Sequence, residues 1–175
     1  MNVIGFAGWS GSGKTTLIET VIGILTTRGF SVSLIKHAHH RFDIDHEGKD
    51  SWRHRQAGCR EVMISSERRW SLTHELKGDN EPTLHRLLEK LSPCDLVLVE
   101  GFKKAELPKI EVYRAGASET LLFPTDKHII AIATDAADPA IQQDTSLPVL
   151  DINNPIVVAH FIIAHFQLEE RQHCT

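Results

Sequence analysis

The sequence predicts an α/β fold with a mostly parallel central sheet that is flanked by helices. Short apolar runs of strand length alternate with longer stretches of helical periodicity, and this alternation is typical of parallel sheets. A strand, a glycine-rich loop, a helix and a second strand follow one another near the amino terminus, within the size of one βαβ unit. The length of 175 residues predicts a single domain over residues 1–175.

The first unit opens with a strand over residues 2–7, a short apolar run that leads directly into glycines. Residues 15–28 are predicted to be a helix because their apolar positions follow helical spacing, and Gly29 ends it as a C-cap. A second apolar strand is expected over residues 31–35.

The middle of the chain is more polar. Residues 37–49 lack periodicity and are interpreted as a functional loop, and a short helix is expected over residues 50–57. Residues 61–65 and 69–73 predict two strands of an antiparallel hairpin at a sheet edge, within residues 60–74. Such an edge offers unpaired backbone groups with which a second chain could pair.

The second half returns to alternating strands and helices. An amphipathic helix is expected over residues 82–91, and the unbroken apolar character of residues 95–99 predicts a central strand. The closing helix is predicted to start at Asn154 as N-cap with Pro155 at its first position. Three further strands are predicted at residues 109–113, 128–133 and 149–152.

The charge and hydropathy of the chain argue against a nucleic-acid-binding or membrane-spanning protein. The net charge of −4 argues against a broad nucleic-acid surface, which needs clustered Lys and Arg. No apolar run reaches the roughly 18 residues of a membrane span, and no basic leader with a cleavage site is seen, so we expect a cytoplasmic protein. Cys59, Cys94 and Cys174 are widely spaced and are expected to be reduced thiols.

The motif with the most specific chemistry is GWSGSGKT, which matches the P-loop pattern at Gly8, Gly13, Lys14 and Thr15. Its glycines allow successive backbone N–H groups to point at phosphate oxygens, and the following helix adds the positive end of its dipole. Lys14 is expected to neutralise the β and γ phosphates. The hydroxyl of Thr15 is a ligand for Mg²⁺, which keeps most of its ligands as water and substrate oxygens.

Two further strand ends carry candidate residues. Glu100 follows the central strand, where an acidic residue of P-loop proteins holds Mg²⁺ or orients the attacking water, so Lys14 and Glu100 are the catalytic candidates. Thr134 and Asp135 bear on base choice, because a carboxylate can accept from the ring N–H and exocyclic amine of guanine. The full Asn-Lys-x-Asp form of the guanine motif is absent.

The loop KHAHHRFDIDHEGKDS combines imidazoles with carboxylates and leaves two interpretations open. One is a transition-metal site, since both groups are suitable ligands. The other is a switch-like loop that senses the γ phosphate, with Asp43 or Asp45 near Mg²⁺ and Lys36 or Lys49 meeting a second anionic ligand.

These motifs together resemble the MobB family of molybdopterin-guanine dinucleotide biosynthesis adaptors. The resemblance is carried by GWSGSGKTTL, LIKHAHHRFDIDHEGKDS, the RQAG that follows and DLVLVEGFK. It implies a homodimeric GTP-binding protein with weak GTPase activity that assists the guanylyltransferase MobA in joining GMP to molybdopterin. Base specificity rests mainly on this resemblance.

The resemblance also assigns residues by motif. Thr15 and Glu100 would serve Mg²⁺, with Asp45 as a weaker candidate. The phosphates would be bound by Gly11, Ser12, Gly13, Lys14, Thr15 and Thr16. Candidate contacts for a bound molybdopterin phosphate or a partner are Lys36, His37, His40 and Lys103.

Two alternatives use the same P-loop. A small-metabolite kinase would need an acceptor site and an Arg-bearing lid, for which Arg53, Arg55, Arg68 and Arg69 are available although no segment clearly forms a lid. A GTPase that delivers a metal such as nickel would use the histidine loop, and it predicts stoichiometric metal in the purified protein.

Overall fold

The computed structural model describes residues 1–38, 42–116, 120–135, 141 and 145–169. The chain forms two compact units, which are described separately below. The larger unit consists of Met1–His37 and Leu87–Thr175, and the smaller unit is Ala38–Arg86.

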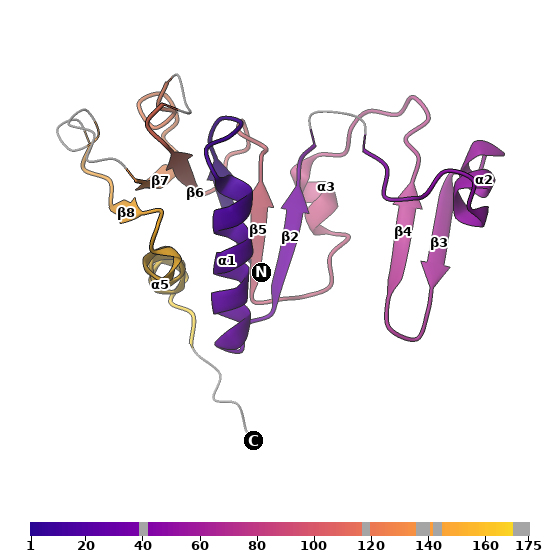
Figure 1. Cartoon of the computed structure of the whole chain (residues 1–175), viewed down its shortest axis with the longest axis horizontal. Coiled ribbons are helices and arrows are strands. Elements are labelled where there is room, and N and C mark those ends of the chain that lie inside the picture. Colours follow the sequence, from indigo (N-terminus) through magenta and orange to yellow (C-terminus); the bar gives the residue numbers. More distant parts are fainter. Residues whose placement is uncertain (39–41, 117–119, 136–140, 142–144, 170–175) are drawn as a thin grey trace. The chain divides into compact units, whose positions relative to one another are not determined.

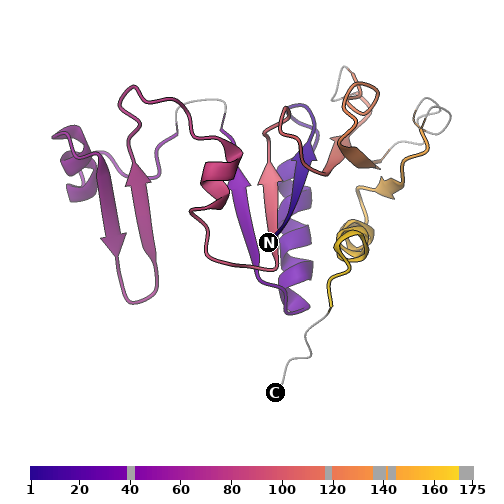
Figure 2. The ribbon, with the colours of Figure 1, turned by 180° about the vertical axis from the view of Figure 1, so that it is seen from behind.

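The larger unit is built on a six-stranded sheet with the strand order β2-β5-β1-β6-β7-β8, in which every neighbouring pair is parallel (Figures 1 and 2). This confirms the predicted α/β fold with a mostly parallel sheet, and β5 lies inside the sheet as expected, between β2 and β1. The elements of this unit are β1 (Asn2–Ala7), α1 (Lys14–Thr27), β2 (Val32–Lys36), β5 (Leu96–Glu100), β6 (Lys109–Tyr113), β7 (Ile129–Thr134), β8 (Val149–Asp151) and α5 (Pro155–Phe166).

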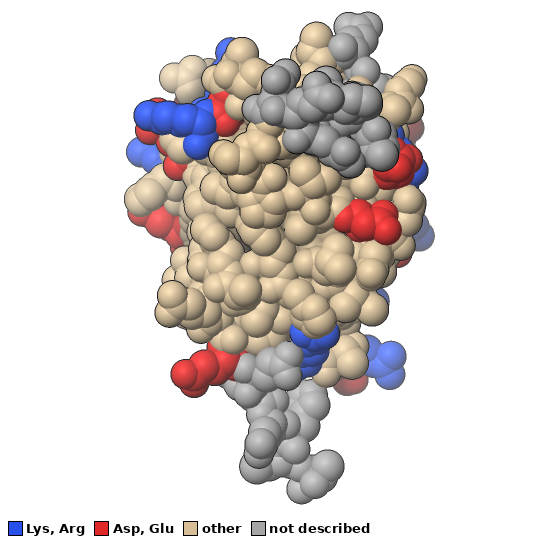
Figure 3. Space-filling view, turned by 90° about the vertical axis from the view of Figure 1, so that its left-hand side faces the viewer, with Lys and Arg blue, Asp and Glu red and all other residues tan. Residues whose placement is uncertain are grey.

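The core lies between this sheet and the two helices α1 and α5, which contact each other. Leu17 and Val21 of α1 and Val158 and Ile162 of α5 are almost fully buried against it. Figure 3 looks onto the side that carries α5 and β8, where uncharged residues fill the centre and charged residues lie toward the rim. Within the described residues, no helix has the length and apolar character needed to cross a membrane.

The smaller unit contains α2 (Asp50–Gln56) and the antiparallel strands β3 (Glu61–Ser65) and β4 (Trp70–His74). The predicted antiparallel hairpin is therefore confirmed, but its predicted place at the edge of a sheet is wrong, because among the described strands β3 and β4 pair only with each other and form a two-stranded sheet of their own. The helix predicted over residues 82–91 is shorter, because α3 covers only Leu84–Leu88. The amides of Lys90 and Leu91 donate to carbonyls three residues back, so the chain leaves the α-helix through a tighter turn.

Candidate phosphate-binding site

The loop between β1 and α1 has a backbone that only glycine accommodates at two positions. A Cβ on Gly8 would lie 2.4 Å from the carbonyl oxygen of Val112, and Gly13 has φ +88 directly before α1. Because Gly13 is also the N-cap of α1, the first turn of the helix has no side-chain cap. Its amide hydrogens and the positive end of the helix dipole are thus directed at the space in front of the loop.

Lys14 lies across this loop. Its ammonium donates to the carbonyl oxygen of Trp9 at 2.5 Å and to the hydroxyl of the buried Ser12 at 3.2 Å. Burial lowers the pKa of Lys14, and the nearby ammonium groups of Lys103 and Lys36 lower it further, whereas Glu100 opposes them. Two lysines and one carboxylate therefore lie near the Lys14 ammonium, so the local charge is net positive and favours an anionic ligand.

Glu100 connects the loop to the edge strand β2. It ends β5, its side chain is largely buried, and the parallel register places it beside Lys36. The hydroxyl of Thr15 donates to one carboxylate oxygen at 3.0 Å, and the ammonium of Lys36 lies 3.2 Å from the other. Two hard oxygen donors side by side fit Mg²⁺, which takes its other ligands from water and phosphate.

Aromatic side chains line this end of the sheet. The rings of His37 and Phe102 lie 4.6 Å apart, and the ammonium of Lys103 sits 4.0 Å from the centre of the Trp9 ring. The indole N–H of Trp9 donates to the carbonyl oxygen of Thr120 at 2.7 Å. Sequence reasoning did not single out Trp9, although its position inside the P-loop motif was a usable signal.

Lys109 is a buried charge on β6 that sequence reasoning also missed. Its side chain is 1% exposed and forms an ion pair with Asp126 at 2.5 Å. The same ammonium donates to the carbonyl oxygens of Lys103 and Ala105, at 2.8 and 3.0 Å. Lys109 therefore holds the loop after β5 that carries Lys103.

Glu111 plays the corresponding role two residues later on the same strand. It is 1% exposed and accepts hydrogen bonds from the amides of Leu122 and Phe123, at 2.7 and 2.8 Å. Burial raises the pKa of this carboxyl, while the two amides act in the opposite direction. Glu111 thus holds the segment that leads to β7, which includes the Thr120 partner of Trp9.

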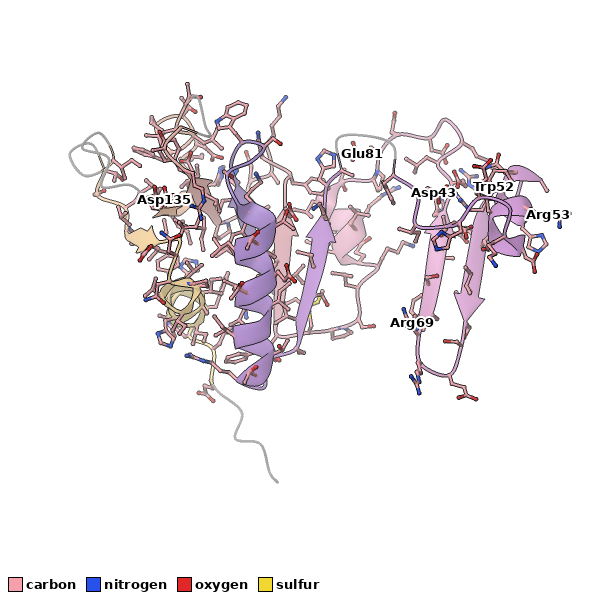
Figure 4. The ribbon with its side chains drawn as sticks, viewed as in Figure 1. Asp43, Trp52, Arg53, Arg69, Glu81 and Asp135 are labelled. Atoms are coloured by element: carbon pink, nitrogen blue, oxygen red, sulfur yellow. The ribbon has the colours of Figure 1, made fainter. Side chains whose placement is uncertain are left out.

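A second group of polar residues lies at the ends of β6, β7 and β8. Thr134 is buried at the end of β7, and Asp135 follows it (Figure 4). The carboxylate of Asp135 accepts from the guanidinium of Arg114 at 2.6 Å, and a second nitrogen of Arg114 lies 3.4 Å from the side-chain oxygen of Asn153. Arg114 was not among the residues that the sequence singled out.

The carboxylates of the histidine loop lie in the smaller unit, around Arg55. The guanidinium of Arg55 contacts Asp43 and Glu75 at 2.7 Å and Asp45 at 3.3 Å, and Asp45 also accepts from the hydroxyl of Ser51. The hydrogen bond from Arg55 lowers the pKa of Asp43. The role of Asp45 as a Mg²⁺ ligand stays a prediction.

The structure leaves the metal interpretation of the histidine loop open. His40, a candidate ligand contact, and the neighbouring His39 lie outside the described residues. Among the residues that the structure does describe, no group of three His, Cys, Asp or Glu side chains could hold a metal ion.

The chain is similar to proteins of one known family. The family model of "Molybdopterin guanine dinucleotide synthesis protein B" (MobB) matches residues 3–135. The molybdopterin-guanine dinucleotide biosynthesis adapter protein of Escherichia coli is 39% identical over 170 residues, covering 94% of this chain and 93% of that protein. The protein of the same name from Haemophilus influenzae is 40% identical over 162 residues, covering 91% and 86%. The crystal structure of Bacillus subtilis MobB superposes with a TM-score of 0.76 at 26% identity, covering 97% and 100%.

Proposed function

Because the chain belongs to the MobB family, an adapter family of molybdopterin guanine dinucleotide biosynthesis, we propose that it binds GTP with Mg²⁺ and assists a MobA-type guanylyltransferase. In this proposal its own GTPase activity is weak. The observation that carries it is the glycine loop before α1, where Gly13 leaves the first turn of the helix without a side-chain cap. There the Lys14 ammonium lies within hydrogen-bond distance of the Trp9 carbonyl and the Ser12 hydroxyl. A triphosphate would add negative charge beside Lys14 and Lys103, whereas Lys36 already pairs with Glu100 at 3.2 Å.

Different residues of the loop would contact different parts of the triphosphate. The amides at the start of α1 would bind phosphate oxygens, and Lys14 would exchange the Trp9 carbonyl for the β and γ phosphates. Thr15 and Glu100 would hold Mg²⁺, whose chemical contribution is to neutralise charge on the phosphates. Glu100 would also orient a water molecule for slow hydrolysis.

A second anionic ligand would meet the basic groups on the β2 side of this loop. Lys36 and His37 follow one another at the end of β2, and Lys103 lies over Trp9. We propose that these side chains contact the phosphate of molybdopterin. The corresponding role of His40 remains a prediction from the family resemblance.

Calorimetric titration of the purified protein with GTP, ATP and molybdopterin, each with and without Mg²⁺, tests this function. We expect GTP to bind at least tenfold more tightly than ATP, a difference of about 1.4 kcal/mol, and Mg²⁺ to strengthen GTP binding. Metal analysis of the same sample is the control for the histidine loop. ATP preference with phosphoryl transfer to a metabolite would instead support a kinase, and stoichiometric nickel would support metal delivery.

The homodimer is proposed to form through the β3–β4 hairpin. In the antiparallel register Met63 faces Leu72 and Ser65 faces Trp70, so the three apolar side chains share one face. Met63 and Trp70 are 63% and 64% exposed, and Leu72 is 42% exposed. A two-stranded sheet with an exposed apolar face is only marginally stable in water. Face-to-face packing against the hairpin of a second copy would bury that face.

We therefore expect Met63→Lys to shift the protein from dimer to monomer in sedimentation velocity, because a charge on this face opposes its burial. Glu67→Lys, in the exposed turn between the two strands, is the matched control and should leave the dimer intact. A wild-type monomer at micromolar concentration, or a Met63→Lys protein that stays dimeric, would exclude this interface.

A further inference from the structure

Arg114 connects the phosphate loop to the residues that are proposed to recognise the base. Its guanidinium packs on the backbone of Gly13. The approach is close, since a Cβ added to this glycine would lie 3.2 Å from the Nε atom of Arg114. Its Nη1 atom donates to Asp135 at 2.6 Å, and its Nη2 atom lies 3.4 Å from the Oδ1 atom of Asn153. One side chain thus touches segments that are far apart in the sequence.

The parallel register explains why these segments meet. Tyr113 of β6 pairs with Thr134 of β7, and Thr134 pairs with Asp151 of β8. Arg114 and Asp135 are the first residues after two of these strand ends. Since ligands of open α/β sheets bind beyond the carboxyl ends of the strands, Arg114 and Asp135 lie at the edge where a nucleoside is expected.

The contact between Arg114 and Asp135 is compatible with guanine recognition. A carboxylate has four lone-pair sites on its two oxygens, so the Oδ2 atom can accept from Arg114 and still accept from a ligand. The guanidinium fixes the direction in which the carboxylate faces, and its charge offsets the cost of bringing a carboxylate close to phosphates. Without it, the carboxylate of Asp135 would have no ion-pair partner among the residues that the structure describes.

We propose that Arg114 is a positioning residue for guanine recognition, which orients Asp135 and anchors it to the phosphate loop at Gly13. It supplies the basic partner that the incomplete guanine motif lacks. This inference rests on the proposed binding of GTP. It differs from an ordinary surface ion pair, whose contribution to affinity would not depend on the base that is bound.

The test compares Arg114→Met with wild type in calorimetric titrations with GTP, ITP and ATP. ITP lacks the exocyclic amine of guanine, so the ratio of GTP to ITP affinity measures the contact between that amine and Asp135. We expect this ratio to fall by roughly tenfold in Arg114→Met, the size of one charge-assisted hydrogen bond. Arg114→Lys should retain part of the ratio because a cation remains beside Asp135.

Two further variants make the test specific. Arg60→Met removes an arginine from a surface pair with Asp79 in the smaller unit and should leave every ratio unchanged. Asp135→Asn should lower the GTP to ITP ratio by itself, and adding Arg114→Met to it should lower the ratio no further, because both changes remove the same contact.

The outcomes separate this inference from the function on which it rests. If Arg114→Met weakened GTP, ITP and ATP equally and left the ratios intact, its role would be structural and the inference would be wrong. A wild-type protein that bound GTP, ITP and ATP equally would overturn the assignment of guanine as well. Wild-type preference for GTP that Arg114→Met retained would overturn the role of Arg114 alone.

Discussion

Lys14→Ala is expected to weaken GTP binding by about 100-fold and to abolish hydrolysis, since it removes charge-assisted contacts worth roughly 1.5–3 kcal/mol each. The two nearby lysines cannot replace it, because Lys36 forms an ion pair with Glu100 and Lys103 lies over the Trp9 ring. Calorimetric titration with GTP in the presence of Mg²⁺ measures the loss, and a phosphate-release assay measures hydrolysis.

The unliganded Lys14→Ala protein should be at least as stable as wild type. Lys14 is partly buried and repelled by Lys36 and Lys103, so removing its charge relieves repulsion. A melting temperature that is unchanged or higher would therefore separate loss of a ligand contact from loss of the fold. GTP affinity that Lys14→Ala left unchanged would refute the proposed role of Lys14.

Glu100→Gln is the companion variant, in which GTP should still bind without Mg²⁺ while the increase in GTP affinity caused by Mg²⁺ disappears.

Lys109→Met should have the largest effect on stability. Methionine fills a similar volume, but the carbonyl oxygens of Lys103 and Ala105 lose the ammonium, and Asp126 is left with its contacts to the amide and ring of His128. Removing one partner of a buried ion pair costs about 3–5 kcal/mol. For a chain of this size that corresponds to a melting temperature lower by roughly 10 °C. Urea unfolding followed by circular dichroism measures the free energy directly.

Lys104→Met is the matched control, because the neighbouring Lys104 is exposed and its replacement should be nearly neutral. The double variant Lys109→Met/Asp126→Leu should recover part of the lost stability, since it also removes the carboxylate that has lost its lysine partner. If Lys109→Met unfolded at the same urea concentration as wild type, the buried ion pair would not be the element that holds the loop after β5.

Several elements could be predicted because they depend on neighbours in the sequence. The bounds of β1 and β6 were predicted without error, and those of the other larger-unit strands to within one residue, since apolar runs of strand length allow few other placements. The helix α3 could not be predicted to its length, because propensity over residues 82–91 does not reveal the tighter turn at its end.

The candidate site was predicted only where its chemistry is local. Glycines at fixed spacing, Lys14 and Thr15 form one short segment, and Glu100 ends the most apolar strand. Arg114, Lys109 and Glu111 were missed because charged residues in and beside a strand usually face solvent.

The sequence by itself determined the order of strands and helices, the glycine loop at the start of α1 and the family to which the chain belongs. These follow from local backbone requirements and from short motifs. Only the tertiary structure decided that Glu100 meets Thr15 and Lys36, that Lys109 and Glu111 hold the loops around Trp9, and that Arg114 joins Gly13 to Asp135. Each of these contacts joins residues on different strands or loops, so it exists only once the parallel register has aligned their ends.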